Sequence, residues 1–231
     1  MTTSATPNPW QAALGRRLAQ ALEQSRFAHA PQADDAGEQG AKATRWRLPS
    51  RVAEPVTAVA ALSEMLGMPG QASLVNHCLQ HYRNQLAPER AEDDLGVALA
   101  AYLGACRQAF DHEALTPQRW QVITQWVKAW VIDELPWDDA PLAQRQDAFE
   151  RLAVLTVALG EWTVQASRQG SAQQASATWM ARNTLRGQLG LDLPALCAAL
   201  RQLDSATAAN PSAAHAEIGA AAYRQPGRDP V

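Results

Sequence analysis

A nearly continuous series of amphipathic helix patterns extends from residue 56 to residue 203, and it constrains the fold more than any other feature. Within each segment apolar residues recur every three or four positions, which is the period of one face of an α-helix. Prolines, glycines and paired aspartates separate the segments. The pattern predicts an all-α fold: a single helical bundle of six to seven helices, with a peripheral N-terminal helix and a disordered C-terminal tail.

Local start and stop signals place the expected helices. Threonine before proline at Thr116-Pro117, and the pair Asp93-Asp94, are typical of helix starts. Ser171 is expected to cap a later helix in the same way. We expect bundle helices over residues 56–66, 71–87, 94–110, 117–134, 141–168 and 193–203, and one that begins at residue 171 and ends near Gly187 or Gly190. The longest of these, over residues 141–168, is expected to be the central helix.

Composition changes along the chain indicate four regions. Residues 1–28 carry a modest apolar stripe and are expected to form the peripheral N-terminal helix. Residues 29–55 are rich in proline, glycine and aspartate, so we expect a linker, although Trp46 leaves open an ordered connection that docks on the core. The helical bundle domain is expected over residues 56–203. Residues 204–231, rich in alanine, are expected to form the disordered tail.

The charge distribution bears on the class of partner. The formal net charge is −3, and residues 89–161 hold thirteen acidic and six basic side chains. An acidic centre repels phosphate, so we expect no nucleic-acid binding. A basic, partly apolar protein partner is the better match. The alternative is that the acidic stretch is a solvated helical face that keeps the protein soluble.

No segment is typical of export or membrane insertion. The N-terminal residues lack the basic and apolar regions of a signal peptide. The longest strongly apolar stretch, residues 152–159, is far shorter than the roughly 20 residues that cross a bilayer. We therefore expect a cytoplasmic protein without a membrane span. Cys78, Cys106 and Cys197 are an odd set within apolar patterns, which predicts reduced core cysteines.

Several segments together resemble a known family. These are Asp93-Asp94-Leu95-Gly96-Val97-Ala98-Leu99, the helix start Leu115-Thr116-Pro117, the helix over residues 146–160 and the ending Leu189-Gly190-Leu191-Asp192-Leu193. Over residues 70–200 the chain resembles an all-helical bacterial domain of unknown function. The resemblance implies a helical fold and no assigned activity. Members of that family are often exported or envelope-associated, so export by a route without a signal peptide is the alternative to a cytoplasmic location.

Two histidines form the strongest candidate for metal chemistry. His77 and His81 lie four residues apart on an expected helix, a spacing that lets two imidazoles reach one metal ion. A catalytic zinc site of this type would need an adjacent glutamate and a third ligand, and the neighbouring sequence supplies neither. His112 is a further candidate for that third ligand. We therefore assign no metal and no cofactor, and we keep a metal-dependent helical enzyme using His77 and His81 as one alternative.

The remaining candidates are carboxylates and tryptophans. The carboxylate pairs flank expected helices, where negative charge caps the helix, and no catalytic motif is present, so no catalytic residue is assigned. Trp137 lies in a turn among Asp133, Glu134, Asp138 and Asp139, and this group is the expected partner-binding surface. The preferred function is a non-enzymatic protein-binding module, such as an adaptor, chaperone or immunity-type protein of a bacterial secretion or antagonism system. A secreted or delivered effector without a cleaved signal is a further alternative.

Overall fold

The computed structural model describes residues 9–23, 72–86, 94–132 and 140–209, and the described part is helical. Within these ranges there are seven α-helices and no strand, which confirms the all-α prediction. The helices are α1 (Pro9–Glu23), α4 (Ala72–His81), α5 (Leu95–Asp111), α6 (Pro117–Ile132), α7 (Leu142–Gln169), α8 (Ser171–Leu189) and α9 (Leu193–Ala209). A π-helical turn, η4 (Tyr82–Leu86), directly continues α4.

The helix starts follow from capping chemistry that is visible in the sequence. Asp94 is the N-cap of α5, and its carboxylate accepts a 3.1 Å hydrogen bond from the backbone N–H of Val97. The hydroxyl of Thr116 accepts from the backbone N–H of Arg119 at the start of α6. Ser171 was expected to cap α8 but does not. Gly170 is the N-cap, with a φ of 103° that favours glycine, and no side chain caps the helix.

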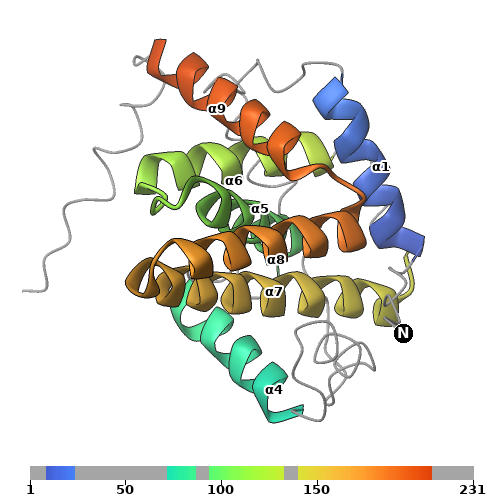
Figure 1. Ribbon diagram of the computed structural model, residues 1–231. Coiled ribbons are helices and arrows are strands. Elements are labelled where there is room, and N and C mark those ends of the chain that lie inside the picture. Colours follow the sequence, from blue (N-terminus) through green and yellow to red (C-terminus); the bar gives the residue numbers. More distant parts are fainter. Residues whose placement is uncertain (1–8, 24–71, 87–93, 133–139, 210–231) are drawn as a thin grey trace, which may run out of the picture.

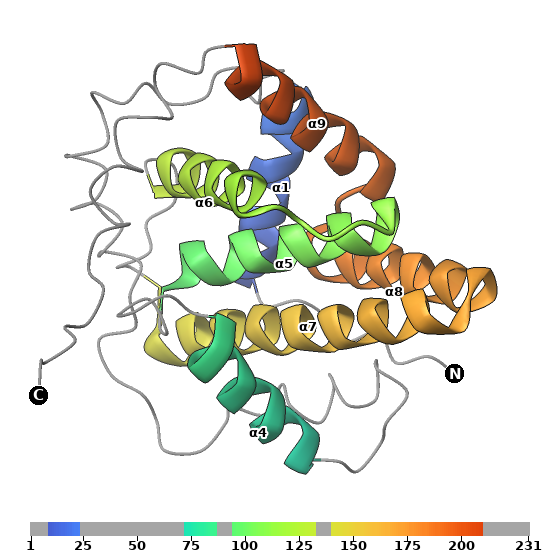
Figure 2. The same cartoon turned by 90° about the vertical axis from the view of Figure 1, so that its left-hand side faces the viewer.

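The core lies around α5, which packs against α6, α7, α8 and α9 (Figure 2). Fourteen of the 17 residues of α5 are buried, whereas α7 is buried mainly over residues 146–159. The longest helix is central as well, as expected: α7 also buries fourteen residues, and it packs against α1, α4, α5 and α8. Gly104 explains one close contact: a methyl carbon of Leu115 and the ring of Trp120 lie over it, where a larger residue would clash.

The N-terminal helix contributes to this core. Leu14 and Leu18 of α1 are fully buried, and Gly15 lies against the backbone of Leu189 at the end of α8. α1 packs mainly on α8, with further contacts to α7 and α9 (Figure 1). The N-terminal helix is thus part of the core of the bundle.

The C-terminal helix is longer than expected. α9 continues through Ala209, six residues beyond the expected end at Leu203, so residues 204–209 are helical and the boundary of the expected tail is wrong. Asp204, the first residue beyond the expected end, is held in place by arginines of α5 and α6. Residues 210–231, the linker over 29–55 and the expected helix over 56–66 lie outside the described residues.

No described helix is long and apolar enough to cross a bilayer. The three cysteines are buried and unpaired, as the sequence indicated.

Candidate functional site

The site is built on α4, and an apolar stripe holds this helix against α7. Val75, Cys78, Leu79 and Tyr82 are buried, at the three- and four-residue spacing of one helix face. The ring of Tyr82 meets the ring of Phe149 of α7 edge to face, with centroids 5.8 Å apart. Figure 2 shows α4 on one side of α7 and α5 on the other. The crossing is therefore fixed by core packing.

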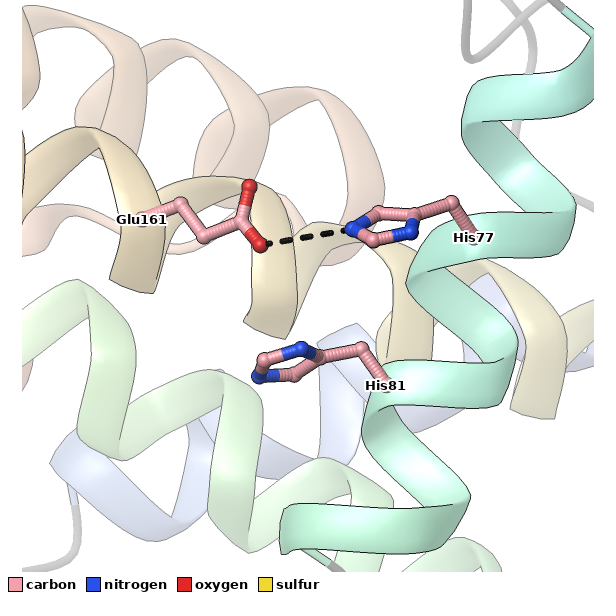
Figure 3. Close-up of side chains that lie close together, drawn as sticks. All are labelled: His77, His81 and Glu161. Atoms are coloured by element: carbon pink, nitrogen blue, oxygen red, sulfur yellow. Dashed lines mark ion pairs between the residues drawn. The ribbon is translucent and has the colours of Figure 1, made fainter.

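His77 and His81 project from the flank of α4, beside this stripe. Both side chains point toward Glu161 of α7 (Figure 3). His77 Nε2 lies 3.8 Å from Glu161 Oε1, and one potential ligand atom from each of the three residues lies within 4.8 Å of the other two. The two imidazole rings have their centroids 6.2 Å apart. Two packed helices thus bring two nitrogens and one carboxylate to one place, although His81 and Glu161 are eighty positions apart in the sequence.

These separations suit a metal ion with small adjustments. Zinc–nitrogen and zinc–oxygen bonds of about 2.1 Å in a tetrahedral site place neighbouring ligand atoms about 3.4 Å apart. The His77 and Glu161 side chains are 62% and 51% exposed, so rotation about their side-chain bonds can close the remaining distance without disturbing the core. Two imidazoles and one carboxylate are also a donor set that zinc and similar ions prefer.

Cys78 lies between the two histidines in sequence but belongs to the core. Its side chain is 1% exposed, and burial, with a smaller contribution from the Glu161 carboxylate, raises the pKa of its thiol to about 11. The thiol is therefore protonated at neutral pH, and thiolate is the form that binds metal. His112 is not a ligand here either: it is the C-cap of α5, outside this cluster.

Glu161 is the residue that the sequence analysis missed. It supplies the third ligand that the neighbourhood of His77 and His81 lacks, and it comes from a helix eighty positions away. Its one sequence signal is an acidic side chain two positions after the apolar run of residues 152–159, beside Trp162. The expected partner-binding group, Trp137 with Asp133, Glu134, Asp138 and Asp139, lies outside the described residues.

A second charged cluster joins α5, α6 and α9 through ion pairs. Arg107 of α5 donates from Nε to Asp111 and from Nη2 to Asp204 of α9. Arg119 contacts Asp204 at 3.2 Å, and Arg201 pairs with Asp111 while its guanidinium lies over a neighbouring phenylalanine ring. Burial lowers the pKa of the Arg107 guanidinium, but its hydrogen bonds to the two aspartates outweigh this, so the net shift is upward. The charges compensate one another, which favours a structural role.

Comparisons with known proteins identify a family and leave the activity open. The model of a family described as a family of unknown function (DUF6683) matches residues 11–197, well over half of the chain. No curated protein and no solved structure matches. The resemblance to a helical domain of unknown function is confirmed, and the matched region begins before residue 70, where that resemblance began. Leu14 and Leu18 of α1, which are buried in the core, lie within the matched region.

Proposed function

We propose a function from the premise that the chain belongs to DUF6683, a family of unknown function, so that the assignment depends on this chain's own contacts. The protein is a helical binder of a divalent transition-metal ion, held by His77, His81 and Glu161. One observation carries the proposal: the ligand atoms of three residues from two packed helices lie within 4.8 Å of one another.

The donor set narrows the choice of metal. Magnesium and calcium prefer sites made entirely of oxygen, whereas imidazole suits zinc, copper, nickel and iron. Zinc is the simplest probe because it has no redox chemistry and accepts a distorted geometry. Its three protein ligands would leave a further coordination position for water or another molecule, as in catalytic zinc sites. This open position keeps a metal-dependent enzyme among the functions that the site supports.

Isothermal titration of zinc into the metal-free protein, purified without a histidine tag, tests the proposal. We expect one ion per chain in the wild type. Removal of a direct ligand by His77→Ala or Glu161→Gln is expected to weaken binding at least as much as the loss of an outer-shell partner, which costs about 10–100-fold. His112→Asn is the matched control, since it removes a histidine outside the cluster and asparagine tolerates the left-handed φ of 56° there. Equal affinity of the wild type and His77→Ala would overturn the proposal.

A protein-binding module is the second candidate function. Trp179 of α8 favours it, since this large aromatic side chain is 61% exposed and tryptophan is enriched among interface anchors. The adaptor, chaperone and immunity-type roles, and the acidic group around Trp137, belong to this candidate. A pull-down from native lysate with Trp179→Ser and Trp137→Ala variants separates the two surfaces. A stoichiometric partner lost in one variant identifies the surface, and no stoichiometric partner for the wild type counts against this candidate.

A further inference from the structure

A groove of about 650 Å³ opens beside the candidate metal site. Two of the three metal-binding residues, His81 and Glu161, form part of its wall, together with Gln108 of α5 and a long segment of α7. An added Cβ at Gly160 would meet no atom within 4 Å, so the wall is open there. A molecule in this groove would therefore lie beside two of the residues that would hold the metal.

Along α7, the floor of the groove is charged at two positions and apolar between them. Glu161, Val164 and Arg168 follow one another at helical spacing and all line the groove, with the valine between the two charged residues. Val164 is 53% exposed and is one of two large apolar side chains so exposed among the described residues. Seven residues of helix separate the α-carbons of Glu161 and Arg168 by about 10 Å, and the arginine side chain leans back toward the helix N-terminus.

Charge and polarity indicate the ligand class. A divalent ion bound by two neutral imidazoles and one carboxylate keeps a net charge of about +1, and the Arg168 guanidinium adds another positive charge. The hydroxyl of Thr163, also on the wall, is buried and has no hydrogen-bond partner among the described residues. The metal site and Arg168 therefore each favour an anion, and the apolar surface of Val164 lies between them. An aliphatic molecule with a carboxylate at each end matches both positive positions.

We propose that the groove binds an aliphatic dicarboxylate, with one carboxylate on the open position of the metal and the other on Arg168, and with methylene groups over Val164. This inference rests on the proposed function, since it needs the metal. Neither carboxylate alone makes both contacts, so a monocarboxylate binds more weakly. Arg168 is not a metal ligand, so its loss leaves metal affinity unchanged.

Cobalt(II) in place of zinc provides the test, because its visible absorption changes when a new ligand coordinates. The cobalt-loaded protein is titrated with adipate, and with acetate as the single-carboxylate comparison. We expect adipate to alter the spectrum and acetate to bind at least about tenfold more weakly, the scale of one charge-assisted contact. Arg168→Gln is expected to lower the adipate affinity by about tenfold with cobalt affinity unchanged. Arg182→Gln, which removes an exposed arginine of α8, is the control and is expected to match the wild type.

The possible outcomes separate the two proposals. A wild-type protein that binds no cobalt overturns both. Cobalt that binds with no spectral response to adipate, or with the same response in Arg168→Gln and the wild type, overturns the dicarboxylate proposal alone. Equilibrium dialysis after the titration checks that cobalt is still on the protein; its loss to adipate would mean chelation and would also overturn the dicarboxylate proposal.

Discussion

Arg107 Nη2 donates a 2.7 Å hydrogen bond to Oδ2 of Asp204, a residue 97 positions later in the chain. The arginine side chain is 3% exposed and the aspartate 20% exposed, so the pair is largely shielded from water. It joins the last turns of α5 to the middle of α9. Because a buried charge without a partner is costly, this contact stabilises α9 where it continues beyond Leu203.

Asp204→Ala is therefore expected to lower the free energy of unfolding by about 1–3 kcal/mol, because it removes an acceptor from a buried guanidinium. Urea denaturation followed by circular dichroism measures the change. Glu113→Gln is the control: that side chain is 73% exposed and contacts Arg119 only at 3.8 Å, so no measurable change is expected. Equal stabilities of Asp204→Ala and the wild type would show that the pair contributes nothing.

Gly15→Ala tests the docking of α1. A Cβ at this position would overlap the backbone carbonyl of Leu189, which cannot move aside as a flexible side chain does. We expect a loss of about 1–3 kcal/mol in the free energy of unfolding and faster proteolysis within α1.

Gly187→Ala is the matched glycine control on α8. An added Cβ there meets no atom within 4 Å, so the better helix propensity of alanine is expected to stabilise the protein by about 0.5–1 kcal/mol. If both substitutions change stability in the same direction by the same amount, α1 is not held by close contact at Gly15.

Zinc is expected to raise the melting temperature. A free zinc concentration one hundred times the dissociation constant stabilises the folded state by about 2.7 kcal/mol, which corresponds to a shift of about 5–10 °C for a chain of this size. Chelation by EDTA reverses the shift. Differential scanning calorimetry of the wild type, Glu161→Gln and His112→Asn measures it. A full zinc-dependent shift in Glu161→Gln would place the ion elsewhere on the protein.

Burial raises the pKa of Cys197 to about 12, and the nearby Asp111 carboxylate adds to the effect; burial also raises the pKa of Cys106. We expect neither thiol to react with Ellman's reagent at pH 8 in the folded protein, and all three cysteines to react in urea.

The same shift predicts a pH dependence of stability. Between the ordinary thiol pKa of 9.0 and about 12, the folded state keeps the Cys197 proton that the unfolded state loses. The contribution of the buried Cys197 thiol to the free energy of unfolding is thus fully present below pH 9, and it is lost as the pH rises through 12. Urea titrations at pH 8 and pH 10 check the sign, with Cys197→Ala as the control in which the difference shrinks. A free energy of unfolding that rises between the two values would contradict it.

Local signals predicted the helices well because their causes are local. Asp94 and Thr116 cap α5 and α6 through groups three residues away, and the apolar stripe of α4 is visible as spacing alone. Ser171 shows the limit of such signals, since a serine at a helix start is no cap where the preceding Gly170 takes that position. The end of α9 could not be predicted either, because a partner on another helix stabilises it.

The helical character of the chain, the starts of most helices and the shared face of His77 and His81 on α4 can all be predicted from the sequence, since they depend on residues within a few positions of one another. The positions of Glu161 beside those histidines and of Asp204 beside Arg107 depend on how the helices pack in three dimensions. The physical reason is that helix pairs are chosen by how whole surfaces pack, as at Tyr82 against Phe149 and at Gly15 against Leu189. The sequence pattern of one helix does not show which other helix packs against it.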